Sequence, residues 1–276
     1  MSTTSSASGA KSGMGRAWIG GDPETPRRLR LFALPFAGGN ASSFGEWPSR
    51  LPGWIAFSPV HLPGRERRIM EPAIDNARTL IAQLVPAITP WLDRPYALLG
   101  HSMGAMLAYE LAQALQQRGL PIPELLIVSG HGAPNLPRRF RDVSHLGDAA
   151  FVAAVMELGG LPSMLLDEPE LLALVLPALR ADFRLCETYR WSPRPPLPCP
   201  ILAIGGRGDP IAGLPELQSW QAMTSAPLTC EMFDGNHFFI HRAMPAVVAL
   251  IARAIAERLR DASAARGPTA SELRLS

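Results

Sequence analysis

A serine flanked by glycines has the surroundings of an enzymatic nucleophile. Ser102 is the central residue of the segment GHSMG at 100–104. An apolar run at 96–99 precedes this segment, and a helix-like segment at 105–112 follows it. A buried strand that ends in so tight a turn holds the serine in a strained backbone conformation and exposes its hydroxyl above the sheet edge. Ser102 is therefore the predicted nucleophile, and the following helix N-terminus would favour negative charge on a reacting oxygen.

His237 is the predicted base. A serine hydroxyl needs a base within hydrogen-bond reach, and that base needs a carboxylate to orient it. After such a turn the chain order is serine, acid and histidine, each on a loop that follows a strand. His237 comes directly after the last predicted strand, and Gly235 permits a sharp turn toward the site. The other histidines beyond the serine fit less well. His131 would leave no further strand to supply the acid, and His145 and His241 lie in helical or pre-helical sequence.

Asp209 is the predicted acid. The loop after the fourth predicted strand, 130–134, contains no carboxylate, whereas Asp209 lies on the glycine-containing loop after the fifth. A turn or helix-capping aspartate is the ordinary alternative before a proline. Asp234 is the rival acid, but it stands three residues before His237 and is expected to shape that loop.

Two backbone N–H groups are expected to bind the oxyanion that forms during acyl transfer. Met103, directly after the serine, supplies one of them. Ala37 supplies the other, on the glycine-rich loop after the first predicted strand. This loop carries neither the phosphate-binding Walker pattern nor G-x-G-x-x-G, so nucleotide binding there is a poorer interpretation.

These residues need a parallel sheet to position them. Short apolar runs bounded by Gly and Pro alternate with helical patterns, which predicts an α/β fold with a mostly parallel central sheet flanked by helices. We expect strands at 30–35, 54–60, 96–100, 124–129, 200–205 and 228–233. Helices are expected at 78–92, 103–118, 214–223 and 244–262. Between about 135 and 198 only helical periodicity occurs, which predicts a helical insertion over the carboxyl ends of the strands.

Composition limits the other possibilities. A chain of 276 residues with 47% hydrophobic content can bury a sizeable core, and a net charge of +2 gives no reason to expect nucleic-acid binding. Three widely spaced cysteines without metal-ligand spacing favour a reducing cytoplasm. No apolar segment is long enough to span a bilayer, so no membrane role is expected. We expect a disordered tail over 1–25, a single domain over 26–262 and a flexible tail over 263–276.

The sequence resembles the external, or type II, thioesterases of polyketide and nonribosomal peptide synthase systems. The resemblance covers most of the chain and rests on seven segments in the same order: LPFAGG (34–39), LPGRERR (62–68), GHSMG (100–104), SGHGAP (129–134), LPALRADF (176–183), GDP (208–210) and GNHFF (235–239). Thioesterase domains built into synthases often place the acid one strand earlier, where this chain has no carboxylate. The resemblance therefore points to the free-standing, editing type.

The resemblance implies an α/β-hydrolase fold with a mobile helical lid and a triad of Ser102, Asp209 and His237, with Ala37 and Met103 as oxyanion donors. The implied activity is hydrolysis of acyl groups from the phosphopantetheine arm of acyl or peptidyl carrier proteins. No metal and no bound cofactor are implied, because the substrate itself carries the phosphopantetheine. Nothing in the sequence demands more than a monomer.

Two other activities could use the same triad. One is a carboxylesterase or lipase acting on free oxygen esters, and the other is an acyltransferase that passes the acyl group to an alcohol or amine. A catalytically idle carrier-binding protein is a further alternative that the complete triad disfavours. Six arginines are candidates for receiving an acidic carrier or its phosphate: Arg65, Arg67, Arg68, Arg138, Arg139 and Arg141.

Overall fold

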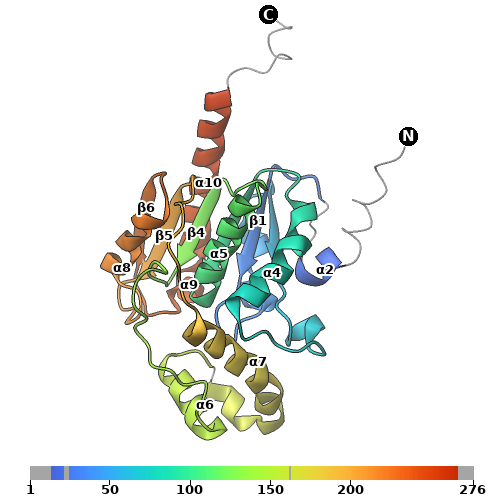
Figure 1. Cartoon of the computed structure of the whole chain (residues 1–276), viewed down its shortest axis with the longest axis vertical. Helices are drawn as coiled ribbons and strands as arrows, with labels where there is room; N and C mark the ends of the chain where they lie inside the picture. The colour runs from blue at the N-terminus through green and yellow to red at the C-terminus, as the bar shows by residue number, and fades with distance from the viewer. Residues whose placement is uncertain (1–13, 22–24, 162, 267–276) are drawn as a thin grey trace, which may run out of the picture.

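The computed structural model describes residues 14–21, 25–161 and 163–266, and its centre is a parallel sheet (Figure 1). Within these ranges six strands pair in the order β2-β1-β3-β4-β5-β6. Their bounds are Leu29–Leu34 (β1), Ile55–Pro59 (β2), Tyr96–His101 (β3), Leu125–Ser129 (β4), Ile201–Gly206 (β5) and Leu228–Phe233 (β6). Each predicted strand is present within one residue at either end. The expected mostly parallel sheet is confirmed.

Helices cover both faces of the sheet, which explains why the central strands are continuous apolar runs. One face packs against α2 (Met14–Trp18), α4 (Ala77–Ile88), η3 (Thr89–Trp91), α5 (Met103–Gln117), α8 (Leu214–Gln218) and η5 (Ser219–Met223). The other packs against η1 (Ala41–Phe44), α3 (Trp47–Arg50), α9 (Phe239–Arg242) and α10 (Met244–Arg266). A short turn, η2 (Glu66–Arg68), follows β2. Successive strand residues alternate between the two apolar clusters, as the pleat requires.

The helical insertion lies between β4 and β5, at the lower end of the molecule in Figure 1. It contains α6 (Asp148–Glu157), η4 (Ser163–Asp167) and α7 (Pro169–Thr188). These helices have an apolar cluster of their own, built around Phe151, Val155, Leu179 and Phe183. Ala37, on the loop after β1, also packs against this cluster. The insertion is therefore in contact with the loop that was predicted to bind the oxyanion.

The two ends of the chain differ from expectation where the structure describes them. Residues 14–21 were expected to be disordered, but they form α2 and an antiparallel bridge from Ile19 to Val60. Trp18 is only 2% exposed, and the Arg68 guanidinium lies 3.9 Å from the centroid of its ring. Burial of this indole is the physical reason for the order. At the other end, α10 continues four residues beyond 262. Residues 1–13, 22–24 and 267–276 lie outside the described ranges. None of the described helices is long and apolar enough to cross a membrane.

Candidate active site

Ser102 occupies the turn between β3 and α5 in a conformation that non-glycine residues seldom adopt, with φ 53° and ψ −120°. Both neighbouring glycines are required by close backbone contacts. A Cβ on Gly100 would lie 1.9 Å from the Gly104 carbonyl oxygen, and a Cβ on Gly104 would lie 2.2 Å from that of Leu34. The turn is fixed further by the Ser102 N–H, which donates to the Ser129 carbonyl at 2.7 Å. The two glycines of GHSMG are thus what allows the chain to adopt this turn at Ser102.

The predicted base and acid lie in line with the serine. Nε2 of His237 is 3.0 Å from Oγ of Ser102, and Nδ1 of His237 is 2.8 Å from Oδ2 of Asp209. Because an ionised carboxylate can only accept, Nδ1–H donates to Asp209 and Nε2 is left to accept from the serine hydroxyl. The other Asp209 oxygen accepts the Ile211 N–H at 2.8 Å. The three residues follow β3, β5 and β6, whose carboxyl ends meet at one edge of the sheet.

The rival residues do not enter this arrangement. The Asp234 side chain is 96% exposed and pairs with Arg207 at 3.3 Å. His131 lies in the wall of the site, with Nδ1 2.6 Å from the Gly132 carbonyl oxygen, and burial lowers its pKa. The choice of Asp209 over Asp234 therefore follows from burial, because the Asp209 side chain is fully enclosed.

Ala37 and Met103 line a small cavity of about 50 Å³ together with Ser102 and His237. Met103 is the first residue of α5, so its N–H has no acceptor within the helix. At Ala37 the preceding carbonyl, that of Phe36, accepts the Gly39 N–H at 2.8 Å. In a trans peptide the N–H points opposite to the carbonyl, so the Ala37 N–H is directed away from this turn.

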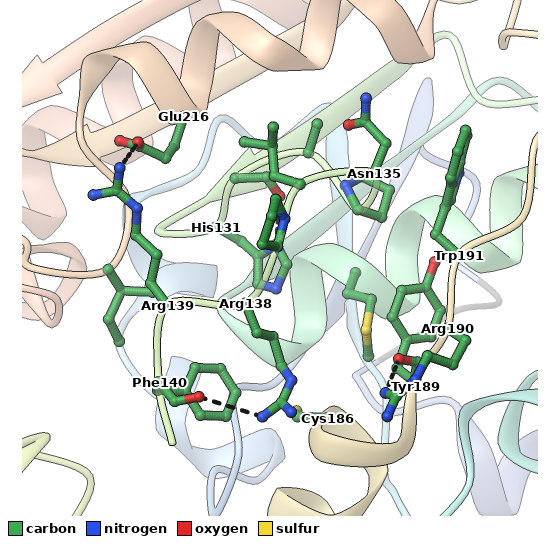
Figure 2. A pocket seen from close by; sticks show the side chains of 17 residues that line it. His131, Asn135, Arg138, Arg139, Phe140, Cys186, Tyr189, Arg190, Trp191 and Glu216 are labelled. Carbon is green, nitrogen blue, oxygen red and sulfur yellow. Dashed lines mark hydrogen bonds and ion pairs between the residues drawn. The ribbon is translucent and has the colours of Figure 1, made fainter. Parts of the chain in front are cut away.

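A larger cavity of about 780 Å³ adjoins the first. Four residues line both: His131, Phe140, Cys186 and Ile211. Figure 2 shows Tyr189, Trp191 and three arginines among the other side chains around it. The site therefore combines a confined space at the serine hydroxyl with room for a much larger molecule beside it.

The thioesterase domain model matches residues 29–255, more than four fifths of the chain. The chain belongs to the thioesterase family. It is 40% identical over 221 residues to thioesterase PikA5 of Streptomyces venezuelae, covering 79% of this chain and 78% of that protein. It is 39% identical over 224 residues to a Brevibacillus parabrevis protein named linear gramicidin dehydrogenase LgrE, covering 80% and 85%.

Among solved structures, the type II thioesterase BorB from the borrelidin biosynthetic cluster superposes with a TM-score of 0.79. Its sequence is 36% identical, and the match covers 86% of this chain and 97% of BorB. The resemblance to type II thioesterases and the α/β-hydrolase fold are thereby confirmed. The chain is accordingly a hydrolase that acts on thioesters, of type II.

His101 of the thioesterase is fully buried beside the triad. Burial holds its pKa well below the ordinary value of 6.5, with the nearby His237 as the next cause. Its Nδ1 lies 3.0 Å from Oγ of Ser129, and its ring centroid lies 5.1 Å from that of His237. A neutral ring at this position adds no positive charge next to His237.

The six candidate arginines of the thioesterase divide into two groups. All three of the first group have internal contacts: Arg65 with Asp182, Arg67 with the backbone carbonyls of residues 16, 17 and 19, and Arg68 with Glu71. The other three lie on the segment that follows β4 and pair with carboxylates of Asp142, Glu216 and Glu157: Arg138, Arg139 and Arg141. The first group is therefore structural. Arg138 and Arg139 line the larger cavity.

One polar cluster of the thioesterase escaped the sequence analysis. Asp182 of α7, 1% exposed, accepts two hydrogen bonds from Arg65 and one from the Gly38 N–H. The sequence suggested a carrier-binding role for Arg65 and no role for Asp182, although LPGRERR and LPALRADF were both part of the resemblance. An acidic residue within the helical periodicity expected between about 135 and 198 was the available signal, because buried carboxylates require partners. Its partner, 117 residues away, could not be identified from the sequence.

Proposed function

We propose that this thioesterase hydrolyses acyl groups carried on the phosphopantetheine arm of carrier proteins by a Ser-His-Asp mechanism. The observation that supports it most is the line of contacts from Asp209 through His237 to Ser102, at 2.8 and 3.0 Å in a largely buried site. The similarity to BorB, a type II thioesterase from the borrelidin biosynthetic cluster, supports the carrier-bound substrate.

In the first half-reaction Nε2 of His237 takes the Ser102 hydroxyl proton while Oγ bonds to the thioester carbonyl carbon. The carbonyl electrons move onto oxygen, and the Ala37 and Met103 N–H groups bind this oxyanion. When the carbonyl re-forms, the carbon–sulfur bond breaks and the pantetheine thiolate takes the proton from His237. Asp209 holds the imidazole tautomer and stabilises the imidazolium.

In the second half-reaction water reaches the acyl-enzyme. His237 removes a proton from the water as its oxygen bonds to the carbonyl carbon, and it returns the proton to Ser102 as the ester bond breaks. The products are the free carboxylic acid and the regenerated enzyme. Neither half-reaction as written uses a metal or a bound cofactor. Among the described residues there is no group of three or more His, Cys, Asp or Glu side chains that could hold a metal ion.

We further propose that the enzyme removes aberrant or stalled acyl units as a cytoplasmic monomer. Free Cys186, Cys199 and Cys230 support a reducing compartment. We assign the larger cavity to the substrate because it shares four residues with the space at Ser102. The name of the LgrE relative suggests a dehydrogenase. However, the loop after β1 has no G-x-G-x-x-G, so this loop does not favour that activity.

The decisive measurement compares three substrates bearing one acyl group: the acetyl-loaded carrier protein, the free acetyl-pantetheine thioester and a matched oxygen ester. We expect the carrier thioester to have the highest kcat/KM and Ser102→Ala to lose at least about 10³-fold in kcat. Equal turnover of the oxygen ester would support an esterase. Product that forms only with an added alcohol or amine would support an acyltransferase. Full activity of Ser102→Ala would exclude the mechanism.

A further inference from the structure

We propose that Asp182 and Arg65 are positioning residues for the oxyanion-binding loop, so that helix α7 of the insertion completes the catalytic site. This inference rests on the proposed function, since it assigns the Ala37 N–H to the oxyanion. In this proposal the orientation of the Ala37 N–H, on the loop after β1, depends on the Asp182 carboxylate of the insertion. The triad itself makes no contact of this kind.

The contacts converge on the turn after β1. Oδ2 of Asp182 accepts the Gly38 N–H at 2.8 Å, and the Gly39 carbonyl accepts Nη1 of Arg65 at 2.9 Å. The Gly39 N–H itself donates to the Phe36 carbonyl. These bonds fix the peptide unit on each side of Ala37, because the Phe36 carbonyl shares a plane with the Ala37 N–H and the Gly38 N–H shares a plane with the Ala37 carbonyl. Asp182 thus holds the peptide unit after Ala37 directly, and Arg65 acts on the unit before Ala37 through Gly39, whose N–H holds the Phe36 carbonyl.

The ion pair has the geometry expected of a rigid support. Arg65 reaches Asp182 through both terminal nitrogens, at 2.6 and 2.7 Å, with side chains only 10% and 1% exposed. Burial alone would lower the pKa of Arg65, but the Asp182 carboxylate outweighs it and raises that pKa. A bidentate pair at this depth allows little rotation of either group. Removing one partner would leave the other charge buried without compensation.

Apolar packing holds the same junction together. Gly38 has φ +78°, and a Cβ at this residue would lie 2.6 Å from Cδ1 of Leu179, one turn before Asp182 on α7. Leu179 is 2% exposed and packs with Ala37 in the cluster of the insertion. The side of α7 that carries Leu179 and Asp182 therefore rests directly on the loop that carries the Ala37 N–H.

Asp182→Asn is the sharpest test because it keeps the shape and removes one acceptor. The two carboxylate oxygens accept three hydrogen bonds, whereas the asparagine NH₂ group would face a donor. With acetyl-pantetheine we expect kcat to fall about tenfold to a hundredfold, less than the loss of a whole oxyanion donor, while KM stays within about twofold. The affinity for a trifluoromethyl ketone analogue, which forms a tetrahedral adduct on Ser102, should fall by the same factor as kcat/KM.

Glu110→Gln is the matched control. Glu110 forms a partly buried bidentate pair with Arg194, which joins α5 to the segment after α7, and it also accepts a hydrogen bond from the Tyr189 hydroxyl. None of these bonds reaches the loop after β1. We expect this variant to retain kcat and inhibitor affinity within about twofold. Thermal melting monitored by circular dichroism measures the folded fraction of each protein. Arg65→Lys, which keeps the charge and leaves the Gly38–Asp182 bond possible, should lose less activity than Asp182→Asn and provides the comparison if the latter does not fold.

The outcomes separate the two proposals. Loss of activity in Ser102→Ala together with wild-type kcat and inhibitor affinity in folded Asp182→Asn would overturn the positioning role alone. Activity that falls only in proportion to the folded fraction, or an equal loss in Glu110→Gln, would also overturn it. If Asp182→Asn does not fold, wild-type kcat and inhibitor affinity in Arg65→Lys would overturn the positioning role. Retained activity in Ser102→Ala would overturn the proposed function itself.

Discussion

Oδ2 of Asp209 lies 2.8 Å from Nδ1 of His237, although 28 residues separate the two in the chain. They meet because they follow β5 and β6, which are neighbours in the sheet with parallel register. Glycines on both loops allow a close approach: the Gly208 N–H donates to the Gly235 carbonyl at 2.8 Å. This bond joins directly the two loops that carry Asp209 and His237.

Replacing Asp209 with Asn should lower kcat by about 10³- to 10⁴-fold with little change in KM. The amide cannot hold the same histidine tautomer, because its NH₂ group would face the Nδ1–H or reverse the direction of the hydrogen bond. Steady-state kinetics with acetyl-pantetheine measures the effect. Asp234→Asn is the control, and it should retain wild-type kcat because this side chain is exposed and away from the imidazole. A larger loss in the Asp234 variant would reverse the assignment of the acid.

Ser102→Gly should be more stable than Ser102→Ala, although both are inactive. A residue with a Cβ at φ 53° and ψ −120° stores about 1–3 kcal/mol of backbone strain, which glycine relieves. The extra freedom of glycine in the unfolded chain offsets about 0.5–1 kcal/mol of that gain. We expect a net difference of about 1 kcal/mol in the free energy of unfolding, measured by urea denaturation. A less stable glycine variant would show that the turn is not strained.

Gly104→Ala should prevent the turn at Ser102 from closing. The new methyl group would lie 2.2 Å from the Leu34 carbonyl oxygen, which is held within the sheet and cannot move aside cheaply. We expect several kcal/mol of destabilisation or failure to fold, read from the thermal melting curve. Gly53→Ala is the control, since its Cβ would meet only the end of the Arg27 side chain, at 3.6 Å. Equal melting temperatures for the two variants would contradict the close contact.

Stability should fall as the pH drops below about 6.5. Burial holds the pKa of His101 well below 6.5, and it also lowers the pKa values of His61, His131 and His241. The unfolded chain therefore binds protons in a range where the folded chain does not, and the free energy of unfolding decreases as the pH falls. For the fully buried His101 the slope reaches about 1.4 kcal/mol per pH unit.

Urea denaturation between pH 7.5 and 5.5 measures this slope. His101→Gln should reduce it, whereas His145→Gln, at an exposed side chain, should not. A free energy of unfolding that is flat across this range would show that the buried imidazole takes up its proton without unfolding.

Local sequence determined much of the site. Only glycine fits at positions 100 and 104 of the turn. These two glycines and the apolar run before them lie within a single short segment of the sequence. The buried strands β3, β4 and β5 were predictable because a parallel sheet covered on both faces requires continuous apolar runs, whereas the edge strand β6 alternates apolar and polar residues. Chain order then placed the acid and the base on the loops after β5 and β6.

The tertiary structure decided what depends on burial and on the direction of side chains. Asp209 and Asp234 both follow strands of the same sheet, yet one side chain is fully enclosed and the other 96% exposed. Residues 14–21, expected in a disordered tail, are ordered because the Trp18 side chain is buried and packs against Arg68. Asp182 pairs with Arg65, which lies 117 residues away in the chain, and no local sequence pattern predicts such a pair. The turn at Ser102 follows from short-range sterics, whereas the ion pair exists only once the insertion has packed onto the sheet.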